Sequence, residues 1–437
     1  MYIPRASQHV IAASIMRPYI TAIIGPRRVG KSSFILHYAE HHPQNKWVFL
    51  NMDKMAQREQ VEKQQLARLI SEYGKQTIDT NHKLWVVIDE AQKCPEIFDQ
   101  IKIIYDAYKD KNKIKFIITG SAVLSLHQLS AESLAGRIEI YHLYEFNLHE
   151  STLLHEPNLP MHSIFDTLTS ESAIPILSHV INELAPFRPI LENQLALQLI
   201  WGGLPELLIQ HSDEEKIIYL HNYLQTYLEK DIRAIETISD LSLYRNMLEV
   251  MAEQTGSVRN DQQIIQALHC KRDTLKKYRG YLEATLLYLD IYPFISSSLK
   301  RFTKSPKGYL LNNGLVSLLT GLTHLVTLEK TGVIGHRVEN WFLNELNSWL
   351  ARLPTPSSIQ YWRTSTGAEV DFIVIKKPEI FPFEVTYSKQ VDQRKIRHLL
   401  SFLQNEPKAK WGYYIYRGEF KINEKNKIIF IPCWAIG

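Results

Sequence analysis

The residues with the clearest chemical meaning lie near the amino terminus, where the chain reads Gly25-Pro26-Arg27-Arg28-Val29-Gly30-Lys31-Ser32. This spacing, G-x-x-x-x-G-K-S, stands between an apolar run at 19–24 and an amphipathic run at 33–38, an order that predicts a strand, a glycine loop and a helix. The backbone N–H groups of such a loop, the helix N-terminus and one ammonium group suit a dense negative charge. The pattern therefore predicts a site for a nucleoside triphosphate.

Each residue type in this loop has an expected role. Gly25 and Gly30 supply backbone freedom. Lys31 is expected to reach the β- and γ-phosphates, and the Ser32 hydroxyl is expected to ligate Mg²⁺. ATP and Mg²⁺ are thus the expected ligands. The other binding candidates are the remaining residues of the loop and the first turn after it: Pro26, Arg27, Arg28, Val29 and Ser33.

A second candidate group follows the apolar run at 84–88, which ends in Asp89 and Glu90. Sheets of α/β proteins place their ligands at the carboxyl ends of strands. We expect Asp89 to hold Mg²⁺ through its water shell, and Glu90 to orient and deprotonate the attacking water as a general base. Another apolar run ends in Thr119 and Ser121. Either side chain could contact the γ-phosphate or the lytic water, and a helix N-cap is an equal alternative for Ser121.

The elements that would position these residues are short apolar runs that alternate with helical patterns in the first 150 residues. The runs are 19–24, 47–51, 84–88, 114–119 and 138–141. Short strands that are apolar on both faces, separated by helices, are typical of a parallel sheet covered on both sides. The predicted fold class is therefore α/β, with a P-loop NTPase core.

Four segments together resemble the AAA-type P-loop ATPases of a prokaryotic family in which a less characterised C-terminal half follows the ATPase. These segments are GPRRVGKSS, VVIDEAQK, IITGSAVLSL and LAGRIEIYHLYEF. The resemblance implies ATP binding and hydrolysis. It also implies that Arg137, in the Leu-Ala-Gly-Arg element, senses the γ-phosphate or acts as an arginine finger, in cis or on a neighbouring subunit. An ordinary surface ion pair is the alternative for Arg137.

The amino-acid composition is typical of a globular protein. The chain has 437 residues, of which 22% are charged and 45% apolar, and this length favours two to four domains. No segment reaches the roughly eighteen uncharged apolar residues of a membrane span, and the first 16 residues lack a signal-peptide pattern. We therefore expect a cytoplasmic protein without a membrane partner. The cysteines, Cys94, Cys270 and Cys433, show no spacing typical of disulfides or zinc sites.

The net charge of +4 is unevenly distributed. Segment 256–310 has ten Lys and Arg against four Asp and Glu, a local charge of +6, which is typical of a nucleic-acid-binding surface. Two helical patterns and a strand hairpin in this segment resemble a winged helix-turn-helix, a double-stranded DNA-binding module. The expected contacts are Lys271, Arg272, Thr274, Lys276, Lys277 and Arg279 on the second helix, with Lys300, Arg301, Lys304 and Lys307 in the wing.

The last hundred residues resemble the core of PD-(D/E)XK nucleases. In that core a helix Glu and two acids on successive strands gather Mg²⁺, and Glu339, Asp371 and Glu384 stand at the matching positions. The position of the expected lysine, however, is Thr386, which cannot supply a positive charge. Lys389 could replace it only if the strand ends first. A nuclease activity is therefore in doubt, and a vestigial or binding scaffold is the favoured interpretation.

The expected domains are an ATPase core at 1–150, a helical lid or linker at 151–245, a winged helix-turn-helix at 246–328 and a nuclease-like domain at 329–437. Lys230 and Arg233 of the lid are weaker candidates for nucleotide contact. The expected function is ATP hydrolysis coupled to DNA or partner binding by the C-terminal half. The alternatives are a nucleotide-dependent protein-binding adaptor without DNA, or an ATP-gated metal-dependent nuclease. A homo-oligomer or a protein partner is compatible with each.

Overall fold

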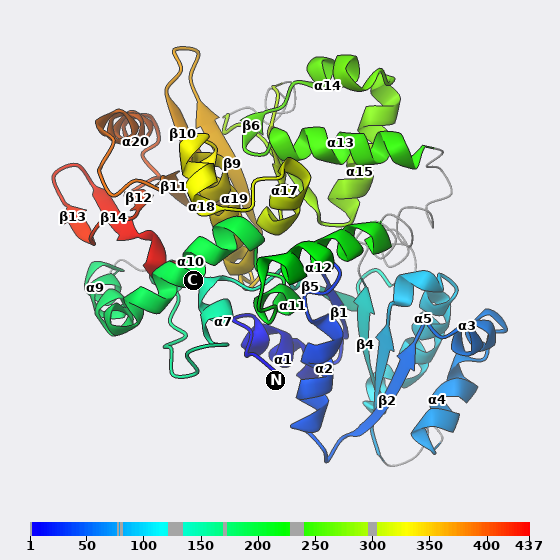
Figure 1. Cartoon of the computed structure of the whole chain (residues 1–437). Helices are drawn as coiled ribbons and strands as arrows, with labels where there is room; N and C mark the ends of the chain where they lie inside the picture. Colours follow the sequence, from blue (N-terminus) through cyan, green and yellow to red (C-terminus); the bar gives the residue numbers. More distant parts are fainter. Residues whose placement is uncertain are drawn as a thin grey trace. The chain divides into compact units, whose positions relative to one another are not determined.

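The computed structural model describes residues 2–76, 78, 82–120, 134–168, 173–227, 240–295 and 304–437 (Figure 1). The predicted roles of Ser121, Lys230, Arg233, Lys300 and Arg301 concern residues outside these ranges. Two compact units make up the chain: Met1–Tyr144 with Ala284–Leu286, and Glu145–Glu283 with Leu287–Gly437. The finer division into four domains stays a prediction. Over the described ranges, no helix combines the length and apolarity that a bilayer crossing requires.

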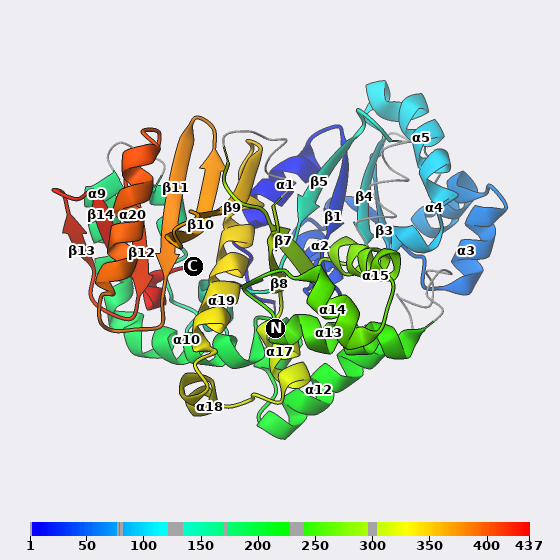
Figure 2. The same cartoon turned by 90° about the horizontal axis from the view of Figure 1, so that it is seen from above.

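A parallel five-stranded sheet forms the centre of the first unit. Its strands are β1 (Ile20–Ile24), β2 (Lys46–Asn51), β3 (Leu84–Asp89), β4 (Ile114–Gly120) and β5 (Ile138–His142). They lie in the order β2-β3-β4-β1-β5, and every neighbouring pair is parallel. Figure 2 shows β1 between β4 and β5. The α/β class predicted from the alternating apolar runs is confirmed.

Helices cover this sheet and explain why its strands are apolar throughout. They are α1 (Gln8–Met16), α2 (Lys31–Glu40), α3 (Met55–Glu62), α4 (Leu66–Gly74) and α5 (Ile97–Tyr108), with short 3₁₀ turns at Ala91–Lys93 and Lys109–Lys111. Leu69 of α4 and Ile101 of α5 pack in one fully buried cluster with Val86 and Ile118 of the central strands. Burial of each such side chain contributes about 1.5–3 kcal/mol to the stability of the first unit. This packing holds in place the strand ends that carry the candidate site.

The first part of the second unit is helical. It contains α7 (Leu148–Thr152), α8 (Ile164–Thr167), α9 (Ala173–Leu184), a 3₁₀ turn at Ala185–Phe187, α10 (Arg188–Trp201), α11 (Pro205–Leu208), α12 (Asp213–Thr226) and α13 (Leu241–Glu253). Capping boxes at Asn147 and Ser212 begin α7 and α12, since each side chain accepts a hydrogen bond from the N3 backbone N–H. The helical character predicted for this region is present, and its role as a lid stays a prediction.

A helix-turn-helix and a small antiparallel sheet follow. The helices are α14 (Asp261–Leu268) and α15 (Arg272–Ala284), and the strands are β6 (Ser257–Val258), β7 (Tyr288–Ile291) and β8 (Lys307–Leu310). The strands pair in the order β6-β8-β7. This is the helix, turn, helix and ribbon order that the sequence predicted, although a winged-helix identity stays a prediction.

The remaining chain builds a separate mixed sheet. Its elements are α17 (Asn313–Thr320), α18 (Leu325–Lys330), α19 (Ile334–Leu350), β9 (Ser357–Arg363), β10 (Glu369–Lys376), β11 (Glu379–Val385), α20 (Gln393–Asn405), β12 (Gly412–Tyr416), β13 (Lys421–Asn423), β14 (Ile428–Pro432) and a 3₁₀ turn at Cys433–Ala435. The strand order is β13-β14-β12-β11-β10-β9, with the inner pairs β11–β12 and β12–β14 parallel. Phe342 of α19 packs against Phe372 and Phe383 of this sheet.

Candidate functional site

The loop between β1 and α2 has the backbone conformation that its glycines allow. Gly30 has φ +96° and Arg28 has φ +64°, both in the left-handed region. A Cβ atom on Gly25 would lie 2.0 Å from the carbonyl oxygen of Leu143, so only glycine fits there. Left-handed residues at alternate positions turn successive backbone N–H groups toward a common side, which is the geometry of an anion-binding nest.

Lys31 begins α2 and folds back over this loop. Its Nζ donates hydrogen bonds to the carbonyl oxygens of Gly25, at 2.9 Å, and Pro26, at 2.8 Å. The side chain is buried, so the ammonium group lies within the loop rather than in bulk solvent. A phosphate oxygen would be a stronger, charged acceptor for the same donors than either carbonyl. The position of Lys31 therefore suits the phosphate contact that the sequence predicts.

Three polar residues meet beside the loop at the carboxyl edge of the sheet. The Ser32 hydroxyl donates to the carboxylate of Asp89 at 3.0 Å. The hydroxyl of Thr119, at the end of β4, donates to the same carboxylate, and the Glu90 N–H donates to Thr119 Oγ1 at 3.3 Å. Carboxylate and hydroxyl oxygens are the hard donors that Mg²⁺ prefers. The Ser32 and Asp89 side chains therefore fit the metal ion that the sequence predicts.

Glu90 adopts an unusual backbone conformation for a residue with a side chain. Its φ of +54° lies in the left-handed region, and its carboxylate accepts a hydrogen bond from Gln92 Nε2 at 2.6 Å. Such a conformation costs about 1–3 kcal/mol in a non-glycine residue and is most often kept where a site needs it. Gln92, three residues beyond β3, was not predicted to have a role, although it belongs to the segment VVIDEAQK.

Arg137 is not brought to this site. Its carbonyl oxygen accepts a hydrogen bond from Ile20 N–H, at the amino end of β1, whereas the phosphate loop follows the carboxyl end. Its guanidinium binds both carboxylate oxygens of Asp106, at 2.9 and 2.8 Å. Five residues of strand, about 15 Å, separate the two ends of β1. This position does not support a role in cis, and the structure shows the ordinary ion pair. A role on a neighbouring subunit stays a prediction.

The basic segment uses several of its cations internally. Arg259 forms ion pairs with Asp261, at 2.8 Å, and with Asp290, while Arg279 is buried and also binds Asp261 at 2.8 Å. Lys307 is buried as well. These side chains are therefore not available as DNA contacts, which removes Arg279 and Lys307 from the predicted set. The cations that remain exposed in the described part of the segment are Lys271, Arg272, Lys276, Lys277 and Lys304.

In the C-terminal sheet a lysine that the sequence did not suggest lies between two of the predicted acids. Lys395 Nζ, from α20, donates to Asp371 Oδ2 and Glu384 Oε2, both at 2.8 Å, and to the Val385 carbonyl at 2.9 Å. Lys389 is exposed. Thr386 pairs through its backbone with Ile415 of β12. A lysine on the following helix has no fixed offset from the strand acids, so spacing could not have identified it.

The third predicted acid, Glu339, has different partners. It accepts a hydrogen bond from the Tyr309 hydroxyl at 3.1 Å, and Lys307 Nζ lies 3.5 Å away. Within the described ranges, no three His, Cys, Asp or Glu side chains are grouped so that they could hold a metal ion. The structure therefore does not gather Glu339, Asp371 and Glu384 into one three-acid group: Lys307 lies beside Glu339, and Lys395 lies beside the other two acids. A metal role for Asp371 and Glu384 stays a prediction.

The ionisation of this cluster follows from its burial and charges. Burial alone would raise the pKa of Asp371, but Lys395 and Lys307 outweigh it and hold that pKa at about 2. Burial raises the pKa of Glu384 well above its usual range, and the nearby Asp371 charge raises it further. Lys395 keeps its proton because the carboxylates overcome the desolvation that would lower its pKa. Asp371 and Lys395 therefore form a buried charged pair.

Comparison with known families divides the chain into three parts. Residues 17–152 match a family described as an AAA domain. Residues 192–325 and 334–436 match two domains of unknown function, DUF8612 and DUF4143. The AAA match includes the whole phosphate loop and the acid pair after β3.

Two curated relatives extend over most of the chain. The uncharacterized protein Rv2008c of Mycobacterium tuberculosis and the uncharacterized protein Mb2031c of Mycobacterium bovis are each 24% identical to it over 351 residues. The aligned part is 80% of this chain and 68% of each relative. The names of these relatives give no activity.

Solved structures of archaeal proteins show a weaker likeness. The Aeropyrum pernix ORC2 protein in its ADP form has 14% identity and a TM-score of 0.33, covering 75% of this chain and 96% of that chain. The Aeropyrum pernix ORC1 protein in complex with DNA has 11% identity and a TM-score of 0.30, covering 75% and 95%. Residues 17–152 thus combine similarity to the AAA domain family with a parallel sheet and a glycine-containing phosphate loop.

Proposed function

We propose that the first unit binds ATP with Mg²⁺ and hydrolyses it. The observation that carries this proposal is the convergence of Ser32, Asp89 and Thr119 beside a loop whose glycines and Lys31 are shaped for phosphate. In this proposal the backbone N–H groups of residues 27–33 hold the phosphates, and Lys31 transfers its hydrogen bonds from the loop carbonyls to phosphate oxygens.

Glu90 is the proposed general base. It follows the strand that carries Asp89, and its carboxylate can accept a proton from a water held near Thr119. Bound Mg²⁺, for which Ser32 and Asp89 are the proposed ligands, would neutralise charge on the phosphates. The decisive experiment is a comparison of ATP binding and hydrolysis between the wild-type protein and Lys31→Ala, as developed in the Discussion.

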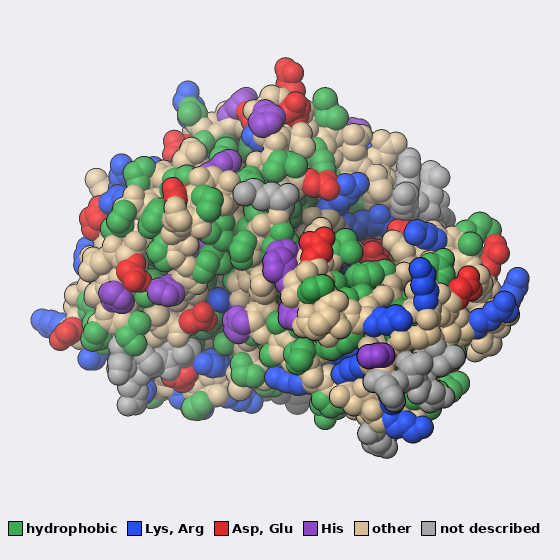
Figure 3. Space-filling view, turned by 90° about the horizontal axis from the view of Figure 1, so that it is seen from below, with side chains coloured by type: hydrophobic (Ala, Val, Ile, Leu, Met, Phe, Trp, Pro, Cys, Tyr) green, Lys and Arg blue, Asp and Glu red, His purple; other side chains and the backbone are tan. Residues whose placement is uncertain are grey.

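We also propose that the second unit contacts the phosphate backbone of duplex DNA through α15. Arg272 and Lys276 are one helical turn apart and exposed, and Lys271 precedes them. The exposed Asp273 is also in the first turn of α15. On the face seen in Figure 3, basic side chains are interspersed with acidic ones. A row of cations on one helix suits phosphate contacts that position a duplex without reading its sequence.

Replacing both Arg272 and Lys276 by Ala is expected to weaken duplex binding uniformly across sequences. The slope of log K against log salt should become shallower by about 2, since each phosphate contact contributes roughly 0.9. Fluorescence anisotropy with a labelled duplex at several salt concentrations measures both the affinity and the salt slope. A double variant at the exposed Lys408 and Lys425 has the same change in charge and should behave as the wild type. An equal loss in both variants would show that binding follows net charge and not α15. No duplex binding by the wild type would favour the protein-binding adaptor.

A metal-dependent nuclease is the second candidate function for the mixed sheet. Lys395 favours it, because this side chain places beside Asp371 and Glu384 the positive charge that Thr386 lacks. In addition, Glu384 Oε1 is buried without a hydrogen-bond partner within the described part of the chain. Asp371 and Glu384 offer oxygen donors that a metal ion would accept, although Glu339 is turned to Lys307.

Asp371→Asn tests this second candidate, because it removes the charge and keeps the shape. Supercoiled plasmid incubated with Mg²⁺ or Mn²⁺ should be nicked by the wild type, and the nicking rate should fall at least about 100-fold in the variant. Glu424→Gln, at an exposed position of the same unit, is the control and should leave the rate unchanged. A wild-type protein without cleavage, or cleavage that survives Asp371→Asn, removes the nuclease from consideration.

A further inference from the structure

A residue far from the phosphate loop in sequence holds the backbone of that loop. Arg5, in the segment before α1, is buried. Its Nη1 donates a hydrogen bond to the Val29 carbonyl oxygen at 2.8 Å, and its Nη2 donates to the Tyr144 carbonyl oxygen at 2.6 Å. One guanidinium therefore joins the loop to the chain that leaves β5. A planar fork of donors can hold two acceptors in a fixed relation, which a single ammonium group does less well.

The carbonyl that Arg5 holds controls an N–H group of the loop. The Val29 carbonyl and the Gly30 N–H belong to one planar trans peptide unit, so they point in opposite directions. A guanidinium bound to the carbonyl therefore directs the Gly30 N–H away from Arg5. Because Gly30 has a left-handed φ and no Cβ, this peptide unit could otherwise rotate at little cost. Arg5 thus limits rotation of the Val29–Gly30 peptide unit.

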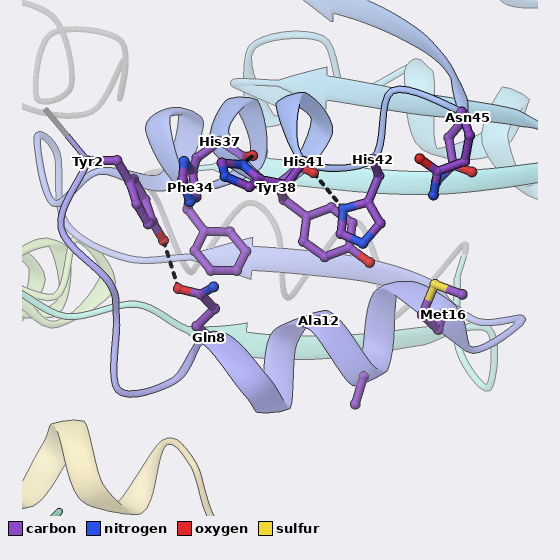
Figure 4. Close-up of a pocket in the computed structure, with 12 residues that line it drawn as sticks. Tyr2, Gln8, Ala12, Met16, Phe34, His37, Tyr38, His41, His42 and Asn45 are labelled. Carbon is purple, nitrogen blue, oxygen red and sulfur yellow. Dashed lines mark hydrogen bonds between the residues drawn. The ribbon is translucent and has the colours of Figure 1, made fainter. Parts of the chain in front are cut away.

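The segment that carries Arg5 is anchored on its other side. The Tyr2 ring stacks on His37 of α2, with ring centroids 3.7 Å apart and an interplanar angle of 14°. The Tyr2 hydroxyl donates to Gln8 Oε1 at 3.4 Å (Figure 4). The Arg5 backbone carbonyl accepts from Gln8 N–H at 2.9 Å. These contacts fix where the Arg5 side chain starts, so its position over the loop is determined by more than its own two bonds.

We propose that Arg5 is a positioning residue of the nucleotide site: it holds the Val29–Gly30 peptide in the orientation that presents the Gly30 N–H to phosphate. This inference rests on the proposed ATP-binding function. It assigns no contact between Arg5 and the nucleotide. ATP and ADP would share the phosphates bound by this loop, so loss of Arg5 weakens the binding of both nucleotides to a similar extent. The same loss changes KM more than kcat.

A matched control exists at the opposite end of the same sheet. Lys115 is a buried lysine that also holds backbone carbonyls: its Nζ donates to Ser14 and Arg17, both at 3.0 Å, and to Tyr19. Burial lowers the pKa of Lys115 to about 7. These carbonyls lie before β1, on the side away from the phosphate loop. Lys115→Met therefore removes a buried side-chain donor with a comparable structural role and leaves the loop unchanged.

The experiment compares Arg5→Met, Arg5→Lys and Lys115→Met with the wild type. For each protein it records the Kd of Mg·ATP and Mg·ADP, KM, kcat and the thermal midpoint. Arg5→Met is expected to raise both Kd values and KM by about tenfold, with kcat within about threefold of the wild type. Arg5→Lys keeps one donating cation and should recover part of the loss. Lys115→Met should lower the thermal midpoint while its Kd values stay within about twofold of the wild type.

Two results would overturn the inference. One is an unchanged Kd in Arg5→Met, and the other is an equal weakening in Lys115→Met, which would show that nucleotide affinity follows only the stability of the unit. Failure of the proposed function looks different, because the wild type itself would then bind no nucleotide. If the wild type binds ATP and Lys31→Ala does not, while Arg5→Met binds normally, only the role of Arg5 fails.

Discussion

Lys31→Ala is expected to weaken ATP binding by about 100-fold, equivalent to about 2.7 kcal/mol, and to reduce hydrolysis to background. Lys31 is the first residue of α2, and its ammonium group already lies inside the loop, where it donates to the carbonyl oxygens of Gly25 and Pro26. In the variant no side chain replaces these donors at the phosphates. Because the lost contacts are charge-assisted, their contribution is about twice that of neutral hydrogen bonds.

Isothermal titration with Mg·ATP and a phosphate-release assay measure the two effects. Lys83→Ala is the matched control: this half-buried lysine of the same unit donates to Asn112 Oδ1 at 2.6 Å. It should bind and hydrolyse ATP as the wild type does. A Lys31→Ala protein that is folded and binds ATP with wild-type affinity would show that the loop is not the phosphate site.

Glu90→Gln is expected to separate binding from hydrolysis. The Kd for Mg·ATP should stay within about threefold of the wild type, while kcat falls by roughly 10²–10⁴, the usual contribution of a general base. The amide has nearly the shape of the carboxylate and can keep a hydrogen bond with Gln92, but it cannot accept the proton of the attacking water.

Single-turnover hydrolysis with saturating ATP measures this loss without interference from product release. Glu72→Gln, exposed on α4 of the same unit, makes the same chemical change away from the site and should not alter kcat. Equal turnover in Glu90→Gln and the wild type would show that a group other than Glu90 accepts the proton of the attacking water. A loss of ATP binding in Glu90→Gln would instead indicate that the left-handed backbone at residue 90 had changed.

Local patterns predicted the first unit well because its chemistry is local. The glycine loop places its residues within eight positions of one another, and the apolar runs at 20–24 and 84–88 are strands that the sheet buries on both faces. Asp89 could be assigned because a parallel strand delivers its last residue to a known edge. The strand order and the contact between Thr119 and Asp89 depend on pairing between distant segments, so the sequence could name Thr119 as a candidate but could not give its partner.

The errors concern cations whose partners are distant in sequence. Arg137 precedes its strand, and only the parallel pairing of β5 with β1 shows that it lies at the amino end. Arg279 and Lys307 counted toward a surface charge, yet both are buried against acids from other elements. A count of charges cannot distinguish a solvated lysine from a buried one, since both increase the net charge equally.

Lys395 was missed for a related reason. It acts on Asp371 and Glu384 from a helix, where the residue that faces the sheet depends on how α20 packs. The same holds for Arg5, whose contact with Val29 joins residues 24 positions apart without any motif. Both residues are cations buried among acceptors, a feature that only packing reveals.

Equilibrium titration of the wild-type protein with a fluorescent ATP analogue tests the central claim most directly. In the presence of Mg²⁺ we expect saturable binding of one nucleotide per chain with a Kd in the range of about 1 μM to 1 mM. Unlabelled ATP should displace the analogue, and chelation of Mg²⁺ should weaken the binding of the analogue. The absence of saturable binding up to about 1 mM, or binding that Lys31→Ala leaves unchanged, would contradict the account.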